Sequence, residues 1–287
     1  MRGLRQHLTW VFVVLSALSA TILPGHRVAL SAATLPSYAH VVIVVEENRS
    51  QANIIGNKQA PFINALAAGG AIMAQSFAET HPSEPNYLAL FAGSTFGVTK
   101  DTCPVNAGAA PNLASELLAS GRTFAGFSED LPAVGSTVCS AGKYGRKHVP
   151  WVNFSNVPPT VSVPFSMFPA PRNYASLPTL SFVIPNNDNN MHDGSIAQGD
   201  AWLNRQMTPY ANWAKANNSL LIVTWDEDDG GPRNQIPTVF YGAHVAPGTY
   251  NNTINHYNVL STLEEIYGLP KTGYAANAPA ITSIWGG

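Results

Sequence analysis

Apolar residues in this chain gather in short continuous runs, several of which lead directly into polar or acidic side chains. The clearest run is 40–45 (HVVIVV), and similar runs occupy 180–185 (LSFVIP) and 219–225 (SLLIVTW). Short apolar runs rich in β-branched residues predict buried strands. Weaker patterns of the same kind predict further strands over 71–77, 123–127 and 236–241.

Helical patterns fill the intervals between these strands. Residues 61–68 begin at a proline and end before two glycines, and residues 201–216 carry a stripe of large apolar side chains at helical spacing. The remaining expected helices are 85–93, 112–120 and about 257–266. Strands that alternate with helices predict an α/β protein, a three-layer sandwich in which helices cover both faces of a central, mainly parallel sheet.

One long segment, 129–178, is rich in Pro, Ser, Asn and Val and shows little periodicity. We expect it to be a surface excursion within one domain and not a linker between two domains. Cys103 and Cys139 are the only cysteines. In an exported chain they most simply form a disulfide, which would hold this excursion and contribute roughly 4 kcal/mol in the chain-entropy model.

The N-terminal residues have the pattern of a secretory signal peptide. Arg2 and Arg5 precede an apolar run over 8–23, and small residues follow at 31–33. We therefore expect a signal peptide over 1–33, a single domain over 34–287, and a secreted or periplasmic location. The apolar run is too short and too rich in Ser and Ala to predict a stable transmembrane anchor.

The charge of the chain argues against one broad class of function. The formal charge is −2, and removal of residues 1–33, which hold three arginines and no acid, lowers it to −5. No basic stripe is visible in the sequence, so a nucleic-acid partner is not expected. The oligomeric state stays open.

Polar clusters follow three of the predicted strands. They are Glu46-Glu47-Asn48, residues 186–193 and residues 226–229 (DEDD). Because the carboxyl ends of parallel strands meet at one edge of a sheet, these clusters are expected to converge there. Neighbouring carboxylates repel one another, so a fold that keeps four of them together needs a compensating cation. The alternative for 226–229 is a solvated acidic turn.

Ser83 is the candidate nucleophile. It lies just before a helix that starts near Pro85, where free backbone N–H groups and the helix dipole favour a phosphate group. A serine hydroxyl becomes a useful nucleophile only beside a base or a metal ion, and the acids at the strand ends are candidates to hold a metal ion. The alternative is that Ser83 only caps the helix.

Histidines supply further candidate chemistry. His81 lies two residues before Ser83, His192 lies in the cluster after a strand, and His256 opens the last helix. Imidazole rings bind phosphate oxygens or protonate a leaving group. His244 also follows a strand, whereas a lone loop histidine is usually solvated, and His148 therefore receives no role.

Six ordered motifs resemble a bacterial phosphoesterase family that contains secreted acid phosphatases and phospholipases C and is related to the alkaline phosphatase superfamily. The motifs are HVVIVVEENRS, THPSEPNYLALFAG, NNDNNMHDGS with GDAWL behind it, TWDED, NQIPTVFYGAHVAPG and NHYNVLSTLEEIYGLP. They span roughly Tyr38 to Pro270. The resemblance implies an α/β sandwich around a central mixed sheet, as in alkaline phosphatase.

The resemblance also implies one divalent metal ion, whose identity it does not fix. By motif position, the ligands are expected to be Glu47, Asn48, Asp226 and Glu227. Ser83 looks like the nucleophile that forms a phosphoserine and also touches the metal ion.

The same motifs imply the groups that handle the substrate. His81, His192 and His256 look like the residues that bind phosphate and move protons. Asn86, in the motif that carries Ser83, is expected beside the substrate.

Four further acids are expected around this set. Glu46 is the alternative to Glu47 as a metal ligand. Asp188 and Asp193 would supply a second metal ion if this chain resembled the related two-metal enzymes, although the family pattern favours one. Asp228 is expected to support the site from the loop behind the ligands.

These features predict a secreted, metal-dependent phosphoesterase that hydrolyses small phosphate monoesters, as acid phosphatases do. A short segment between Ser83 and His192, and a chain that ends about twenty residues after its last helix, favour a compact monoesterase. The runner-up is a phospholipase C-type diesterase that acts on phospholipids. The rival of another class is a non-catalytic secreted module that binds metal ions or glycans.

Overall fold

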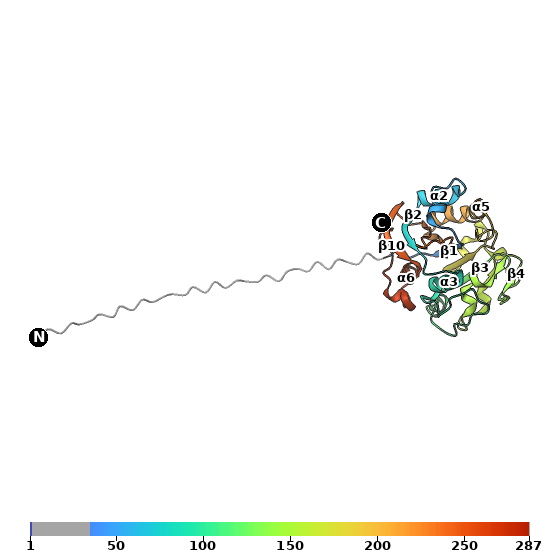
Figure 1. Ribbon diagram of the computed structural model, residues 1–287, viewed down its shortest axis with the longest axis horizontal. Coiled ribbons are helices and arrows are strands. Elements are labelled where there is room, and N and C mark those ends of the chain that lie inside the picture. Colours follow the sequence, from blue (N-terminus) through green and yellow to red (C-terminus); the bar gives the residue numbers. More distant parts are fainter. Residues whose placement is uncertain (2–34, 287) are drawn as a thin grey trace. The chain divides into compact units, whose positions relative to one another are not determined.

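An eight-stranded sheet runs through the part of the chain that the structure, a computed structural model, describes, namely Met1 and residues 35–286 (Figure 1). From edge to edge the strands are β10 (Gly248–Asn255), β2 (Ala71–Phe77), β9 (Thr238–Gly242), β8 (Ser219–Trp225), β1 (His40–Glu46), β7 (Leu180–Ile184), β3 (Phe124–Ser128) and β6 (Ser162–Pro164). Within this sheet β9 pairs antiparallel with β2 and β8, and every other pairing is parallel. The predicted α/β class with a mainly parallel sheet is confirmed.

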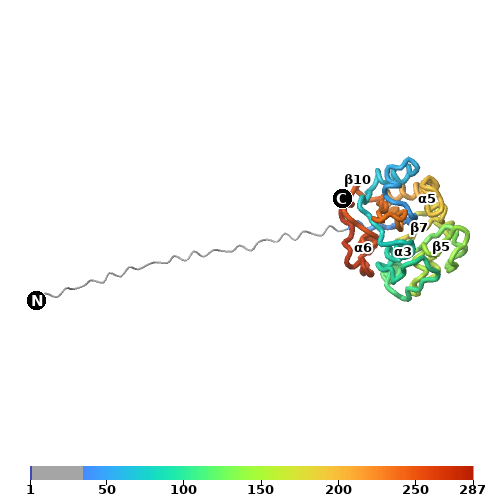
Figure 2. The backbone as a smooth tube through the Cα atoms, viewed as in Figure 1, coloured from blue at the N-terminus to red at the C-terminus, as the bar shows by residue number. Residues whose placement is uncertain are grey.

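Helices cover both faces of the sheet (Figure 1). One face carries α1 (Gln51–Ile54), α2 (Pro61–Gly69) and α5 (Ile196–Ala216), and the other carries α3 (Ser83–Ala92), α4 (Leu113–Ala119) and α6 (His256–Ile266). Figure 2 shows α3 and α6, which are far apart in the sequence, lying side by side. The sheet and its two helical layers form the predicted three-layer sandwich.

The central strand β1 is buried on both faces, as a parallel strand between two helical layers must be. Its side chains alternate: Val41, Ile43 and Val45 pack towards α3 and α6, whereas Val42 and Val44 pack towards α2 and α5. The same alternation continues into the acids that follow. Glu46 is therefore directed to the α5 face and Glu47 to the α3 face.

Within the eight-stranded sheet, the hydrophobic pattern misses two strands, β6 and β10. β6 has only three residues, and β10 (GTYNNTIN) carries mostly exposed polar side chains. Both lie at the edges of the sheet. An edge strand needs little apolar character, so neither produces the run of hydrophobic residues by which the central strands are recognised.

The prediction of a surface excursion over 129–178 is wrong. The segment holds β6, a small hairpin and several 3₁₀ turns, and its Trp151 and Phe154 are buried in the core beside α3. Gly126 of β3 makes room for Trp151, because a Cβ atom at this glycine would lie 2.1 Å from the indole atom Cζ2. The hairpin is β4 (Ser140–Ala141) and β5 (Tyr144–Gly145), and the turns are η1 (Arg146–His148), η2 (Pro150–Asn153), η3 (Pro159–Val161), η4 (Phe165–Met167) and η5 (Pro171–Ser176), with η6 (Gly273–Asn277) near the C-terminus.

Two helices begin earlier than predicted. The α5 helix begins at Ile196, before the predicted Ala201, because the Ser195 hydroxyl accepts a hydrogen bond from the Gln198 amide at 3.2 Å and so caps it. The α3 helix begins at Ser83, so the candidate nucleophile is its first helical residue.

The predicted disulfide between Cys103 and Cys139 is present. By their contacts, the described residues 35–286 belong to one compact unit. Apart from Met1, the predicted signal peptide over 1–33 lies outside the described residues. Among the described helices, none is long and apolar enough to cross a membrane.

The buried Glu264 of α6 should make stability depend on pH. Its Oε1 accepts hydrogen bonds from the Thr272 amide at 2.9 Å and the Thr272 hydroxyl at 2.6 Å, and burial raises its pKa from 4.5 to about 7. The folded protein therefore keeps a proton that the unfolded chain releases, and this contribution to stability is lost as pH rises from 4.5 to about 7.

We predict that Glu264→Gln removes this loss, which amounts to about 3 kcal/mol. Urea unfolding at several pH values between 4 and 8 measures it as the difference between the stability curves of variant and wild type. The control is Glu265→Gln, a partly exposed neighbour on the same helix, whose curve should follow the wild type. Parallel curves for Glu264→Gln and wild type would contradict the assignment.

Candidate active site

The predicted acids lie together where the neighbouring strands β1 and β8 end, on the side of the sheet formed by the carboxyl ends of the parallel strands. The two strands are parallel neighbours in which Glu46 pairs with Trp225, and the Asp226 amide donates to the Glu46 carbonyl at 3.0 Å. Glu47 and Asp226 therefore leave the sheet side by side. This is the edge at which open α/β sheets bind their ligands.

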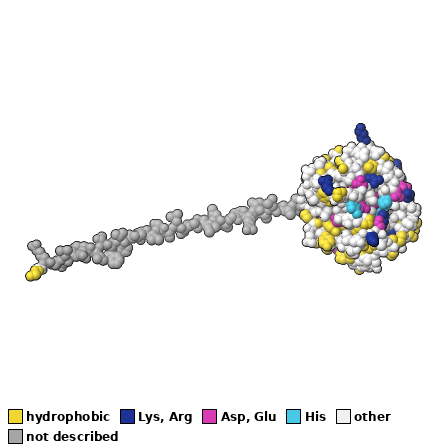
Figure 3. All heavy atoms as spheres, in the orientation of Figure 1, with side chains coloured by type: hydrophobic (Ala, Val, Ile, Leu, Met, Phe, Trp, Pro, Cys, Tyr) yellow, Lys and Arg dark blue, Asp and Glu magenta, His cyan; other side chains and the backbone are white. Residues whose placement is uncertain are grey.

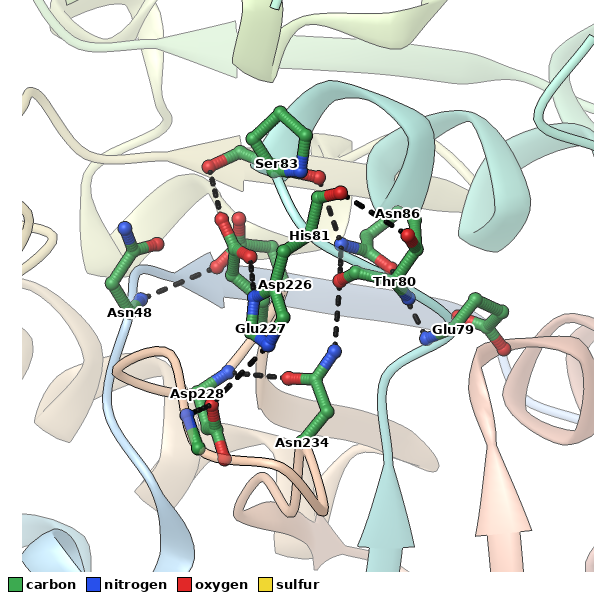
Figure 4. A network of polar contacts seen from close by, with 12 residues as sticks. Asn48, Glu79, Thr80, His81, Ser83, Asn86, Asp226, Glu227, Asp228 and Asn234 are labelled. Atoms are coloured by element: carbon green, nitrogen blue, oxygen red, sulfur yellow. Dashed lines mark hydrogen bonds and ion pairs between the residues drawn. The ribbon is translucent and has the colours of Figure 1, made fainter. Parts of the chain in front are cut away.

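Ser83 lies against these acids (Figure 4). Its Oγ is 2.9 Å from Glu227 Oε1 and 3.2 Å from Glu47 Oε2, so its proton has two carboxylate acceptors. The side chain is buried at the first residue of α3. A nucleophile candidate, a helix N-terminus and carboxylates from two strand ends thus meet at one point, as the sequence predicts.

The electrostatics of this cluster are unfavourable as it stands. Burial raises the pKa of Glu47 to about 8. Burial also raises the pKa of Asp226 well above its ordinary value, and the charges of Glu47 and Glu227 raise it further. Carboxylates this close do not all stay ionised at neutral pH unless positive charge is added.

The predicted metal ligands fit a divalent cation by their chemistry. Asp226 Oδ2 and Asn48 Oδ1 are buried and have no hydrogen-bond partner. The other carboxylate oxygen, Asp226 Oδ1, accepts from the backbone N–H of Asn48 at 3.3 Å. Hard oxygen atoms of this kind suit Mg²⁺, Ca²⁺ or Mn²⁺. As arranged, however, no group of three His, Cys, Asp or Glu side chains among the described residues could hold a metal ion.

His81 faces the same carboxylates. Its Nδ1 contacts Glu227 Oε2, and its Nε2 lies 3.6 Å from Asp228 Oδ1. The imidazole is 39% exposed, so it is the part of this cluster that a substrate reaches from solvent. Asp228 is held in place by the side-chain oxygen of Asn234, which accepts from the Asp228 amide at 2.8 Å.

Asn86, the predicted substrate-binding amide, is occupied by backbone groups. Its Oδ1 accepts from the amides of Glu79 and Thr80, both at 3.1 Å, and its Nδ2 donates to the carbonyls of Thr80 and Pro82. These bonds shape the loop that carries His81 (Figure 4). The structure therefore gives Asn86 a positioning role on that loop.

His192 lies in the loop that follows β7. Its Nδ1 is 2.7 Å from Asp193 Oδ1, and its ring centroid is 6.1 Å from that of His148. Asp193 and Asp188 both bind the exposed Lys143, at 3.1 and 2.8 Å. With their charge met by a lysine at the surface, these two acids offer no support for a second metal ion.

His256 is buried, and both of its ring nitrogens are engaged. Nδ1 lies 2.5 Å from Glu79 Oε2, and Nε2 lies 2.9 Å from the Trp225 carbonyl oxygen. Both partners are acceptors, so the ring carries two N–H groups. Although burial opposes it, the Glu79 charge raises the pKa of His256. This histidine braces the start of α6 against β8, an arrangement that leaves neither nitrogen directed at Ser83.

Glu46 and His244, two further residues considered in the sequence analysis, lie away from Ser83. Glu46 is buried on the α5 face, where the charges of Glu129 and Asp200 add to the effect of burial and raise its pKa. His244 follows β9, which runs antiparallel to β2 and β8. The end of β9 therefore lies on the opposite side of the sheet from the carboxyl ends of β1 and β8. There His244 Nε2 is 3.1 Å from Asn218 Oδ1.

Three residues beside Glu47 have no role in the sequence-based prediction. The Tyr87 hydroxyl donates to Glu47 Oε1, and His148 Nε2 lies 3.2 Å from the same oxygen, with the two rings stacked at 5.2 Å. Burial lowers the pKa of His148 well below its ordinary value, so this imidazole is neutral.

The third is Lys147, which binds Asp101 Oδ2 at 2.7 Å. Although burial opposes it, the bond to Asp101 and the charges of Glu47 and Asp226 raise its pKa. The run Arg146-Lys147-His148 was the available signal, since three adjacent basic residues are unusual in this weakly charged chain.

A serine among carboxylates at the carboxyl ends of parallel strands is the arrangement expected of a phosphoester hydrolase. The chain belongs to the Phosphoesterase family, whose model matches residues 57–270. It is 74% identical to a phosphatidylinositol-3-phosphatase of Mycobacterium tuberculosis, over 100% of this chain and 98% of that protein.

More distant relatives carry phosphatase names as well. An acid phosphatase of Aspergillus fumigatus is 30% identical over 72% of this chain and 51% of its own length. A phosphate-repressible acid phosphatase of Penicillium chrysogenum is 29% identical over 74% of this chain and 55% of its own length. The chain thus spans about half the length of these fungal relatives. The protein is a phosphoric ester hydrolase, which sets aside the non-catalytic module.

Solved structures of low sequence identity share the fold. An alkaline phosphatase superfamily protein of Vibrio parahaemolyticus superposes with a TM-score of 0.59 at 13% identity, over 85% of this chain and 71% of that one. The C-terminal periplasmic domain of EcEptC from Escherichia coli gives 0.57 at 9% identity, over 88% of both chains. At these identities the likeness shows the fold alone.

We predict that His256→Gln costs stability. Below about pH 6.5 the variant should lose about 3 kcal/mol of unfolding free energy, because a buried ion pair is broken. Since the folded pKa of His256 is raised, the deficit should shrink as pH rises through that value. Denaturant unfolding from pH 5 to 9 measures the deficit.

The matched control is His244→Gln, which should stay within about 0.5 kcal/mol of the wild type. A His256→Gln variant with wild-type stability and greatly reduced turnover would instead give His256 the direct chemical role implied by the family resemblance.

Proposed function

We propose that this phosphoesterase hydrolyses phosphate monoesters at Ser83 through a phosphoserine intermediate. The observation that carries the proposal is the position of Ser83 Oγ, within hydrogen-bond distance of carboxylates from two different strand ends. A serine that only capped its helix would bond to backbone amides of the first turn, and no such bond is made by Ser83.

The carboxylates prepare the serine. Glu227 Oε1 accepts the Ser83 proton at 2.9 Å and fixes the direction of the remaining lone pairs. One divalent cation would be held by Glu47, Asn48, Asp226 and Glu227. When bound, it would lower the pKa of the serine hydroxyl and neutralise charge on the phosphoryl oxygens.

Lys147 and two imidazoles lie on the Glu47 side of the proposed site. Lys147 carries a positive charge, whereas His148 is neutral and lies with its Nε2 3.2 Å from Glu47 Oε1, and His192 is its neighbour. Such groups stabilise the charge that builds on the equatorial oxygens during in-line transfer. The exposed imidazole of His81 would donate a proton to the departing alkoxide, a role supported by its access to solvent.

A monoester is favoured over a phospholipid diester as substrate. The relatives reported above are named phosphatases, and the one at 74% identity is named for the 3-phosphate of phosphatidylinositol. That name supports a phosphoinositide monoester as the physiological substrate of this chain. Export to an oxidising compartment is part of the proposal, because the Cys103–Cys139 disulfide is typical of exported proteins.

We predict that Ser83→Ala lowers turnover of p-nitrophenyl phosphate by about 10³-fold or more, because the nucleophile is removed. The circular dichroism spectrum should stay the same as that of the wild type, and the melting temperature should not fall. Ser176→Ala, which removes a hydroxyl from a remote turn, is the control and should keep wild-type activity. Activity retained by Ser83→Ala would overturn the nucleophile assignment.

A second measurement separates monoester from diester chemistry. Rates on p-nitrophenyl phosphate, bis(p-nitrophenyl) phosphate and phosphatidylcholine are compared for the wild-type enzyme. The proposal expects the monoester to be preferred by at least about 100-fold, since the basic groups around Ser83 suit a doubly charged phosphate. Equal or faster cleavage of phosphatidylcholine would favour the phospholipase C-type alternative.

A further inference from the structure

The N-terminus of α3 receives a carboxylate from another part of the chain. Its N-cap residue, Pro82, forms no side-chain cap. Instead, Asp101 Oδ1 accepts a hydrogen bond from the backbone amide of Glu84, the residue after Ser83, at 3.1 Å. A carboxylate suits this position, because the first amides of a helix lack partners within the helix and carry partial positive charge. Asp101 therefore caps the helix that begins at the proposed nucleophile.

A second hydrogen bond joins the same two segments in the opposite direction. Glu84 Oε2 accepts from the Thr102 amide at 2.6 Å, and Glu84 is buried. The start of α3 and residues 101–102 thus each hold a backbone amide of the other, as the two residues of a capping box do. These two bonds fix the position of the Asp101 carboxylate relative to Ser83.

The other oxygen of this carboxylate binds Lys147. Lys147 Nζ donates to Asp101 Oδ2 at 2.7 Å, and the ammonium forms no other hydrogen bond or ion pair with the described residues. Because a lysine ammonium has three N–H groups, two remain for a ligand. The Lys147 side chain is 23% exposed, so a small anion reaches it from solvent. One carboxyl group therefore connects this ammonium to the backbone of the residue after Ser83.

Lys147 is also close to the carboxylates of the site. The next residue, His148, has its Nε2 3.2 Å from Glu47 Oε1. Although burial opposes it, the bond to Asp101 and the charge of Glu47 raise the pKa of Lys147, so the ammonium stays charged. On the face of the domain that Figure 3 shows, basic side chains lie among acidic and histidine side chains. A positive charge with unused N–H groups suits the oxygen atoms of a phosphoryl group.

The segments that carry Asp101 and Lys147 are also joined covalently. Cys103 lies two residues after Asp101 and forms the disulfide with Cys139. The Cys139 carbonyl in turn accepts from the Arg146 amide at 3.0 Å. Loss of the ion pair therefore leaves the two segments connected. A substitution at Asp101 can redirect the ammonium without releasing the segment that carries it.

We propose that Asp101 is a positioning residue that directs the Lys147 ammonium to a phosphoryl oxygen of a substrate bound at Ser83. The inference rests on the proposed function at Ser83 and adds how the cation that meets the phosphate is placed. The two oxygens of the Asp101 carboxylate have separate tasks, since one caps α3 and the other orients Lys147. The ammonium therefore keeps a fixed position relative to the nucleophile.

The variant Asp101→Asn separates the two tasks. The amide oxygen of asparagine can still accept from the Glu84 amide, whereas its NH₂ group cannot accept from Lys147. Isothermal titration calorimetry with inorganic phosphate measures the dissociation constant of the anion independently of turnover. We expect Asp101→Asn to raise this constant about five-fold and Lys147→Met to raise it about ten-fold or more, because a charge-assisted hydrogen bond is weakened or lost.

The sign of the change distinguishes positioning from a direct effect of charge. If Asp101 acted only through its own negative charge, neutralising it would tighten the binding of an anion. Weaker binding is therefore specific to the positioning role. The control is Glu265→Gln, which breaks a lysine–carboxylate ion pair on α6 and should leave the dissociation constant unchanged.

A double variant shows whether Asp101 acts through Lys147. Asp101→Asn combined with Lys147→Met should bind phosphate no more weakly than Lys147→Met alone. Melting temperatures confirm that each variant is folded, and Asp101→Ser, which also removes the carboxylate, replaces Asp101→Asn if the latter does not fold. Unchanged or tighter binding in the Asp101 variant, unchanged binding in Lys147→Met, or additive losses in the double variant would overturn the positioning role.

Ser83→Ala, assayed in parallel on p-nitrophenyl phosphate, keeps the two proposals apart. Retained turnover of the ester by that variant would contradict the proposed function. Lost turnover, together with unchanged or tighter phosphate binding by Asp101→Asn, would contradict the positioning role alone. A wild-type enzyme that binds no phosphate would contradict both.

Discussion

Repulsion among the buried carboxylates of Glu47, Asp226 and Glu227 is the constraint on which the rest of this site depends. Burial is the largest of the causes that raise the pKa of Glu47 to about 8, and the charge of each neighbouring carboxylate makes ionisation of the next acid harder. A fold that keeps such a cluster needs something positive at its centre. The unpaired oxygens of Asp226 and Asn48 would suit such a cation, and the charged Lys147 on the Glu47 side would suit a phosphate bound next to it.

The sheet decides which acids take part. Because side chains alternate along β1, Glu47 faces Ser83 while Glu46 is buried beneath α5 among other acids. Because β9 runs against its neighbours, the loop with His244 ends at the far edge of the sheet, away from the loops after β1 and β8. The direction of a strand and the alternation of its side chains between the two faces of the sheet thus separate residues that look equivalent in the sequence.

Much of this arrangement was predictable from local patterns. The apolar runs that form β1, β7 and β8 end in polar clusters, and a parallel sheet brings such ends to one edge. The environment of individual side chains was not predictable, because it depends on tertiary contacts. His148 comes from a proline-rich segment without periodicity, yet that segment folds into the core and places the ring 3.2 Å from Glu47. Asn86 and His256 lie at the expected motifs, but their polar atoms are taken up by the backbone and by Glu79.

We propose that one divalent cation binds among the carboxylates around Ser83, and anomalous diffraction from crystals grown with Mn²⁺ would locate it. We expect a single strong peak about 2–2.6 Å from side-chain oxygens of Glu47, Asp226 and Glu227. A peak only at the surface acids Asp188 and Asp193, or no peak near Ser83, would contradict it.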